Sequence, residues 1–154
     1  MTLFSNVFVG QSIILFGKQI EKKIMKNIGR EAIIITGGIM LLLLGLFHMF
    51  FPILFDWEDQ LKKLNEENDS IVQMMNICTI TYLFSMGLIL LICRSEIPNS
   101  KAGRLLLLSL SLFFAVRFIL EFLFPGSSLL LGGALLLLVI IFILPVFNRN
   151  ASSV

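Results

Sequence analysis

The chain has 154 residues, of which 57% are hydrophobic and only 14% are charged, and its mean hydropathy is +0.96. Soluble domains have about 45–50% apolar and about 25% charged residues, so this composition excludes an ordinary soluble globular domain. The net charge of +2 gives no electrostatic footprint for nucleic acid, and no nucleic-acid partner is expected.

The apolar residues fall into four long blocks, each long enough to cross a bilayer as a helix. We predict spans at about 31–55, 70–93, 104–124 and 129–147. Short connections make consecutive spans antiparallel. The predicted fold is therefore all-α: an integral membrane four-helix antiparallel bundle over 31–147, with an N-terminal amphipathic segment at 1–30 and a polar tail at 148–154.

The N-terminal segment, residues 1–30, is basic and carries no signal-peptide pattern. Its apolar residues recur every three or four positions, at Ile13, Phe16, Ile20, Ile24 and Ile28, and its lysines occupy other faces. This pattern predicts a helix that lies at a membrane surface. The alternatives are a flexible tail, or a native start at Met25 that would leave residues 1–24 outside the protein.

The first span and its loop combine close-packing residues with polar ones. Gly37, Gly38 and Gly45 would let another helix approach closely. Pro52 is expected to kink or end the span near His48. The connection 56–69 follows, and it is either a short surface helix or a solvated acidic loop, with Trp57 suited to the membrane interface.

The second span has an unusually polar first half. Gln73, Asn76 and Thr79 are three residues apart and form one stripe along a helix, and Tyr82 also lies in this polar half. Such side chains mostly hydrogen-bond to neighbouring helices, so contacts between spans are the first interpretation. The alternative is that the stripe lines a cavity for a ligand or water.

The third span carries an arginine and a glutamate inside its apolar run. Arg117 and Glu121 are four residues apart, so they lie one turn apart on the same face of a helix. Charges in hydrocarbon are costly and usually face a partner or water. The segment Pro125–Ser128 is predicted to be a tight turn that makes the third and fourth spans a hairpin.

Lysine and arginine are concentrated on one predicted side of the membrane. They precede the first span and occur in the second connection, 94–104, whereas the first connection has two lysines among six acidic residues. The positive-inside rule then predicts a multi-pass protein of the cell membrane with both termini in the cytoplasm. The heavy use of Phe, Ile, Leu, Lys and Asn is typical of an AT-rich, bacterial genome.

Three spans bring polar side chains to a similar depth. At about 1.5 Å per helical residue, His48, Asn76 and Arg117 lie about 10, 9 and 12 Å from the outer ends of their spans. The candidate polar layer comprises His48, Gln73, Asn76, Thr79, Tyr82, Arg117 and Glu121. It is either a structural network that fixes helix register or a pocket, open to the outer leaflet, that binds an anionic or polar headgroup.

The sequence lacks the residue patterns of the common metal, haem and catalytic sites. There is one histidine and no Cys/His cluster, so neither a bis-histidine haem nor a zinc site is predicted, and no cofactor or metal is expected. No catalytic serine motif or phosphate loop occurs. Residues 25–147 resemble small four-span integral membrane proteins of bacteria known only as uncharacterised. The similar features are G-L-F-H-x3-P over Gly45–Pro52, W-x3-L from Trp57, and Gly103-Arg104 opening a span that ends with a charged pair.

That resemblance implies no activity, ligand or catalytic residue. We favour a non-enzymatic membrane protein whose partners are the bilayer, a lipid or small amphiphile, a second copy of itself or another membrane protein. The alternative hypotheses are a small transporter or proton-coupled carrier subunit that uses Glu121 and His48, and a membrane enzyme that uses the same polar layer.

Overall fold

The protein is a bundle of membrane-length helices. The computed structural model describes residues 3–124 and 128–147, apart from the side chains of 3–16, 22, 23 and 26. Within these residues there is no strand, and four helices are long and apolar enough to cross a membrane. The segments that meet this criterion are Asn27–Met49, Glu66–Ile92, Lys101–Leu123 and Leu129–Phe147. The predicted all-α fold with four spans is confirmed.

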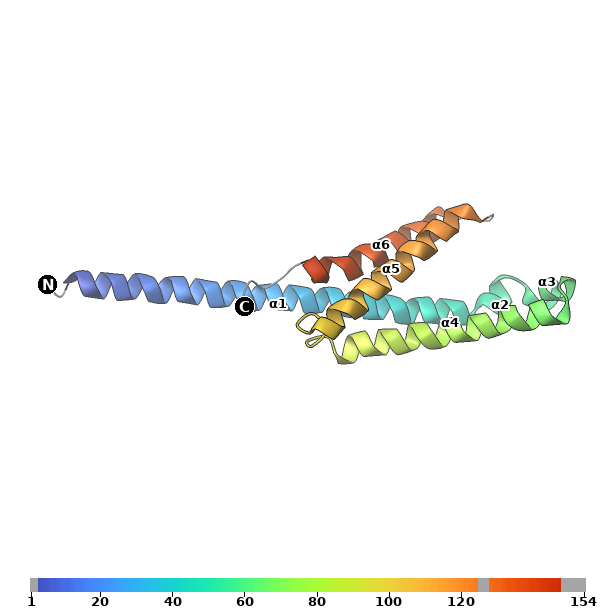
Figure 1. Ribbon diagram of the computed structural model, residues 1–154, viewed down its shortest axis with the longest axis horizontal. Helices are drawn as coiled ribbons and strands as arrows, with labels where there is room; N and C mark the ends of the chain where they lie inside the picture. Colours follow the sequence, from blue (N-terminus) through green and yellow to red (C-terminus); the bar gives the residue numbers. More distant parts are fainter. Residues whose placement is uncertain (1–2, 125–127, 148–154) are drawn as a thin grey trace.

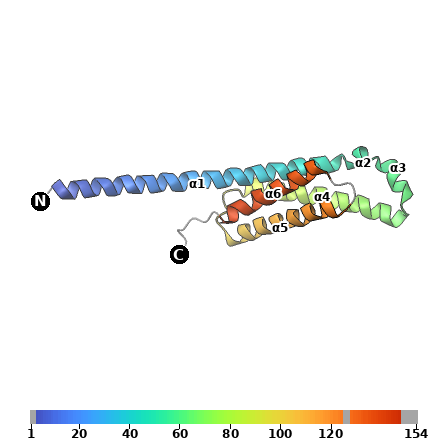
Figure 2. The same ribbon diagram turned by 90° about the horizontal axis from the view of Figure 1, so that it is seen from above.

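The first helix, α1, runs without interruption from Leu3 to Met49. Its N-terminal half projects well beyond the other helices (Figures 1 and 2). The predicted amphipathic segment and the first span are thus parts of one helix in this structure. The described apolar side chains of its projecting part, Ile20, Ile24 and Ile28, are exposed.

The first span ends six residues earlier than predicted, and Pro52 explains the difference. A proline has no N–H to donate and its ring displaces the carbonyl four residues before it, so α1 ends at Met49. Pro52 itself lies in the short helix α2, Phe51–Leu54. A left-handed residue, Asp56 with φ 46°, then turns the chain into α3, Trp57–Gln60, and η1, Leu61–Lys63. The predicted short surface helix is therefore present in this connection.

The second span, α4, covers Glu66–Ile92 and begins before its predicted start. The Asn65 side chain caps it by accepting a hydrogen bond from the Asn68 N–H at 2.9 Å. Glu66, Glu67 and Asp69 occupy its first turn, where negative charge is favourable against the helix dipole. The acidic end of the predicted loop thus belongs to the helix.

The remaining spans, α5 (Lys101–Leu123) and α6 (Leu129–Phe147), form an antiparallel hairpin (Figure 2). Ser100 caps α5 by accepting the Gly103 N–H at 2.9 Å. The limits of α6 agree with the prediction. Most of the predicted turn, residues 125–127, and the predicted tail at 148–154 lie outside the described residues.

Two helix pairs make up the bundle. The helix α1 packs along α4, α5 packs along α6, and the pairs meet where α1 packs against α6. Two glycines explain the close approach of α1 and α4, because a Cβ at Gly87 would lie 3.0 Å from the Gly38 carbonyl oxygen. Gly37 likewise faces Phe142 of α6. The prediction that these span-one glycines allow close helix packing is confirmed.

The connection between α4 and α5 is fastened to α1. The buried guanidinium of Arg30 donates from Nη2 to Asn99 Oδ1 at 2.6 Å. Ile97 is buried, and a Cβ on Gly103 would overlap its carbonyl oxygen, so only glycine fits there. This end of the bundle is closed. At the opposite end the α5–α6 hairpin diverges from α1 and α4 (Figure 1).

Candidate functional site

The two charged residues of α5 form an ion pair at the diverging end of the bundle. Arg117 Nη1 lies 2.8 Å from Glu121 Oε2. The second carboxylate oxygen, Oε1, accepts the backbone N–H of Ser128 at 3.1 Å, at the start of α6. Glu121 therefore neutralises Arg117 and also links α5 to α6. Its negative charge is favourable at this place, because a helix N-terminus attracts anions.

The two partners differ in exposure. The Glu121 side chain is 8% exposed, whereas that of Arg117 is 44% exposed. A guanidinium carries five N–H donors and stays charged, and Glu121 is its ion-pair partner among the described residues. The carboxylate is therefore committed to contacts inside the protein, whereas nearly half of the Arg117 side chain remains accessible.

A groove of about 790 Å³ lies beside this ion pair. We call it the Arg117 groove. Arg117 and Glu121 line one side, and Phe47, Phe51 and Phe55 of the α1–α2 segment line the other. Leucines of α5 and α6 complete the wall. The first and third spans therefore face each other across a groove that has a charged pair on one wall and aromatic rings on the other.

His48 approaches this groove through a ring contact. Its imidazole stacks on Phe51 with ring centroids 4.3 Å apart. Its Nδ1 lies 2.8 Å from the Leu44 carbonyl oxygen, which can only accept, so Nδ1 carries the proton. Among the described residues, no hydrogen bond joins His48 to Glu121 or Arg117.

Asn76 meets the first span at a backbone carbonyl that Pro52 leaves open. In an uninterrupted helix the N–H of residue 52 would bond the His48 carbonyl, and proline has no such N–H. The Asn76 Nδ2 donates to that oxygen at 3.2 Å. The side-chain oxygen of Asn76, Oδ1, is buried and has no hydrogen-bond partner among the described residues. Leaving such an acceptor unpaired costs about 1–3 kcal/mol.

Gln73 and Thr79, the other two residues of the predicted stripe, make side-chain hydrogen bonds within their own helix. Gln73 Nε2 donates to Asp69 at 2.6 Å, and Thr79 Oγ1 donates to the Met75 carbonyl at 2.8 Å. Tyr82 instead packs its ring against Phe113 of α5, with centroids 5.3 Å apart. Within the described part of this stripe, Asn76 thus makes the hydrogen bond that joins two helices.

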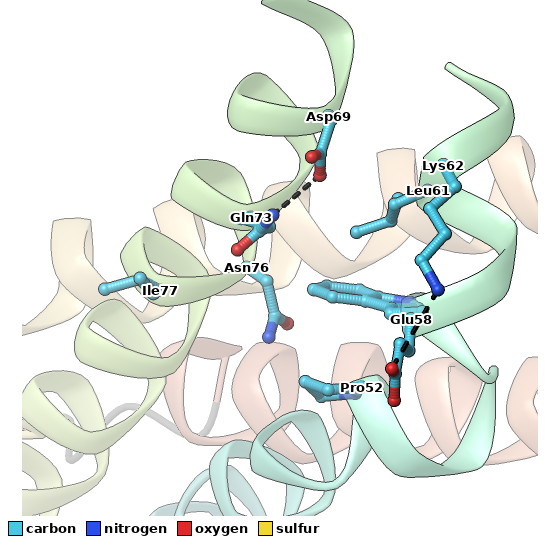
Figure 3. Close-up of a pocket in the computed structure, with 9 residues that line it drawn as sticks. Pro52, Glu58, Leu61, Lys62, Asp69, Gln73, Asn76 and Ile77 are labelled. Atoms are coloured by element: carbon cyan, nitrogen blue, oxygen red, sulfur yellow. Dashed lines mark hydrogen bonds and ion pairs between the residues drawn. The ribbon is translucent and has the colours of Figure 1, made fainter. Parts of the chain in front are cut away.

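A second groove, of about 430 Å³, opens between the α2–α3–η1 connection and the start of α4. We call it the Asn76 groove. Asn76 of α4 points toward Pro52 of α2, with Gln73 and Asp69 above it on the same helix (Figure 3). Trp57 and Lys62 of the connection also line it. The predicted single layer is therefore divided: Arg117 and Glu121 line one groove, and Gln73 and Asn76 line another.

Several residues that line these grooves are missing from the set predicted from the sequence. The phenylalanines at 47, 51 and 55 recur every four residues, a signal that they share one helical face. Asp69 precedes the apolar run, so hydropathy alone places it in the loop. Comparisons with family models, curated proteins and solved structures find no match for this chain.

Proposed function

We propose that this multi-pass membrane protein is a non-enzymatic binder of an anionic amphiphile, which it holds in the Arg117 groove. The observation that carries the proposal is the Arg117 side chain, which is 44% exposed and lines the same groove as Phe47, Phe51 and Phe55. A carboxylate or phosphate would accept hydrogen bonds from the Arg117 guanidinium, and an acyl chain would lie against the aromatic and leucine side chains.

Physical reasoning favours an anion over a neutral ligand. A charged side chain among apolar spans is costly unless it has a partner. Only one oxygen of the Glu121 carboxylate pairs with Arg117, because the other accepts the Ser128 N–H. An anionic headgroup would supply hydrogen-bond acceptors for the Arg117 guanidinium, which lipid hydrocarbon cannot do. The volume of about 790 Å³ lies within the range of about 300–1,000 Å³ common for small-molecule sites.

The carrier alternative has less support. Proton transfer between Glu121 and His48 would require a hydrogen-bonded path, whereas Glu121 is bonded to Arg117 and Ser128, and His48 to Leu44. No arrangement of catalytic groups favours the enzyme alternative among the described residues.

A thermal-shift experiment tests the proposal. The purified protein in a maltoside detergent is titrated with palmitate, with methyl palmitate as the neutral analogue. Palmitate should raise the melting temperature of the wild type, because a ligand that binds the folded state stabilises it, and methyl palmitate should not. The shift should vanish in Arg117→Leu and persist in Arg94→Leu, a control outside the groove. Equal shifts with both probes, or a full shift in Arg117→Leu, would contradict the proposal.

A further inference from the structure

The Asn76 groove is separate from the site of the proposed function and has different chemistry. It is lined by residues of the α2–α3–η1 connection and of the first turns of α4, whereas the Arg117 groove is lined by α5 and α6 on one side. We propose that the Asn76 groove binds the primary ammonium group of an amphiphile. The inference does not rest on the anion site.

The first observation is a buried acceptor without a donor. Asn76 Nδ2 is committed to the His48 carbonyl, so the amide orientation is fixed and Oδ1 faces away from that oxygen. An amide oxygen accepts only, and this one is buried and has no partner among the described residues. A hydrogen-bond donor on a bound molecule would satisfy it.

The second observation is the charge around the groove. Glu58 and Asp69 line it together with Lys62. Lys62 is already paired: its Nζ lies 3.9 Å from Glu58 Oε1 (Figure 3) and 3.1 Å from Asp59 Oδ1. The connection 56–69 has six acidic residues and two lysines. The groove therefore favours a cation over an anion.

The third observation is the size and composition of the groove. A water molecule could satisfy Oδ1 alone, but it takes up about 30 Å³, far less than the 430 Å³ present. Pro52, Leu61 and Ile77 add apolar surface that a hydrocarbon chain would cover. Trp57 adds an aromatic ring, whose face attracts a cation.

These three features together select a primary ammonium with an attached chain. An ammonium group has three N–H donors and a positive charge, so it can donate to Oδ1 and remain near Asp69 and Trp57. A trimethylammonium group has the same charge but no N–H. The contrast between the two separates hydrogen bonding to Asn76 from simple attraction to an acidic surface.

Trp57 is the chain's one tryptophan, so its fluorescence reports on this groove directly. The full-length protein in maltoside is titrated at neutral pH with dodecylammonium and with dodecyltrimethylammonium. We expect dodecylammonium to change the Trp57 emission saturably, with an affinity about tenfold higher than that of the trimethyl probe. Equal affinities would overturn the proposal.

Variants locate the effect. Asn76→Leu should remove the preference for dodecylammonium, whereas Thr81→Val, which loses a hydroxyl bonded to its own helix, should keep it. Because Asn76→Leu also loses the bond to His48, Asp69→Asn is the second variant. Its amide oxygen can still accept from Gln73 while its charge is gone, and dodecylammonium binding should weaken severalfold. Unchanged selectivity in Asn76→Leu, or unchanged affinity in Asp69→Asn, would overturn the proposal.

Two further probes identify the source of the ammonium. Short-chain phosphatidylethanolamine represents a lipid headgroup, and butylammonium represents a free amine. A response to the first alone supports a lipid ligand, and a response to both supports the same chemistry with a water-soluble ligand. No response to either probe or to dodecylammonium would overturn the proposal.

Discussion

Asn76 donates a hydrogen bond to the His48 carbonyl oxygen, the acceptor for which Pro52 cannot supply a helical N–H. A side chain of α4 thus completes the backbone hydrogen bonding at the end of α1. Polar side chains in membrane spans contribute about 0.6–2 kcal/mol when they bond across helices. Through this hydrogen bond, a polar residue of the second span stabilises the backbone where the first span ends.

The contact predicts coupling between positions 52 and 76. Asn76→Leu leaves the His48 carbonyl unpaired, which contributes a loss of about 1 kcal/mol that depends on the residue at position 52. Pro52→Ala restores an N–H that can bond the same carbonyl, so Asn76→Leu should cost less in that background. A double-mutant cycle of melting temperatures measures the coupling. Strict additivity of the two changes would contradict it.

The ion pair of α5 predicts an asymmetric response. Arg117→Leu should destabilise the protein by about 1–3 kcal/mol, because it leaves a nearly buried carboxylate without its counter-charge. The Arg117→Leu/Glu121→Gln double variant should be milder, because the glutamine oxygen can still accept the Ser128 N–H. Replacing both residues with leucine should be worse than that pair. Thermal denaturation of the three variants tests the order.

The glycine contact between α1 and α4 predicts a position-specific cost. Gly87→Ala would place a Cβ 3.0 Å from the Gly38 backbone carbonyl oxygen, so we expect a loss of about 1–3 kcal/mol from overpacking. Gly133→Ala is the matched control, because a Cβ added there would meet no atom within 4 Å. Similar melting temperatures for the two variants would show that α1 and α4 do not pack as described.

The charge distribution predicts the orientation in the membrane. In a background with Cys78 and Cys93 replaced by serine, Glu67→Cys should react with an impermeant maleimide added to intact cells. Lys101→Cys should react only after the membrane is opened. The first position lies in the acidic region that begins α4 and the second in the basic connection before α5. The reverse labelling pattern would mean an inverted topology.

The projecting part of α1 should contribute little to the stability of the bundle. Its described apolar side chains Ile20 and Ile24 are exposed, and the packed part of α1 begins near Arg30. A chain that starts at Met25 should therefore melt within a degree or two of the full chain. A large fall in melting temperature would show that residues 1–24 pack against something in the folded protein.

Hydropathy is sufficient to predict the spans, because the cost of exposing polar groups to hydrocarbon fixes their number and approximate limits. The predicted span limits are wrong where a local interaction sets the end of a helix. Pro52 ends the first span early, and the cap at Asn65 starts the second one early. The contact between Arg30 and Asn99 does not follow from the sequence, since nothing in the N-terminal segment or in the connection 94–104 indicates that these two residues meet.

The candidate site shows the same limit. Residue counts along a helix predict depth, and they place His48, Asn76 and Arg117 at a common level. They do not predict the rotation of each helix about its axis or the angle between helix pairs. These decide that Asn76 lines one groove and Arg117 another. Nor could the sequence show that Glu121 accepts the Ser128 N–H, because that contact depends on how α6 begins.

The continuity of α1 has a mechanical consequence. About 24 residues, or about 36 Å of helix, precede Asn27, and they share an axis with the membrane-length segment. A rotation of that axis by about 10° would therefore sweep the far tip through about 6 Å. His48 lies about 32 Å beyond Asn27 on the same helix. A change of tilt at the His48–Asn76 contact would therefore move the far tip by a comparable distance.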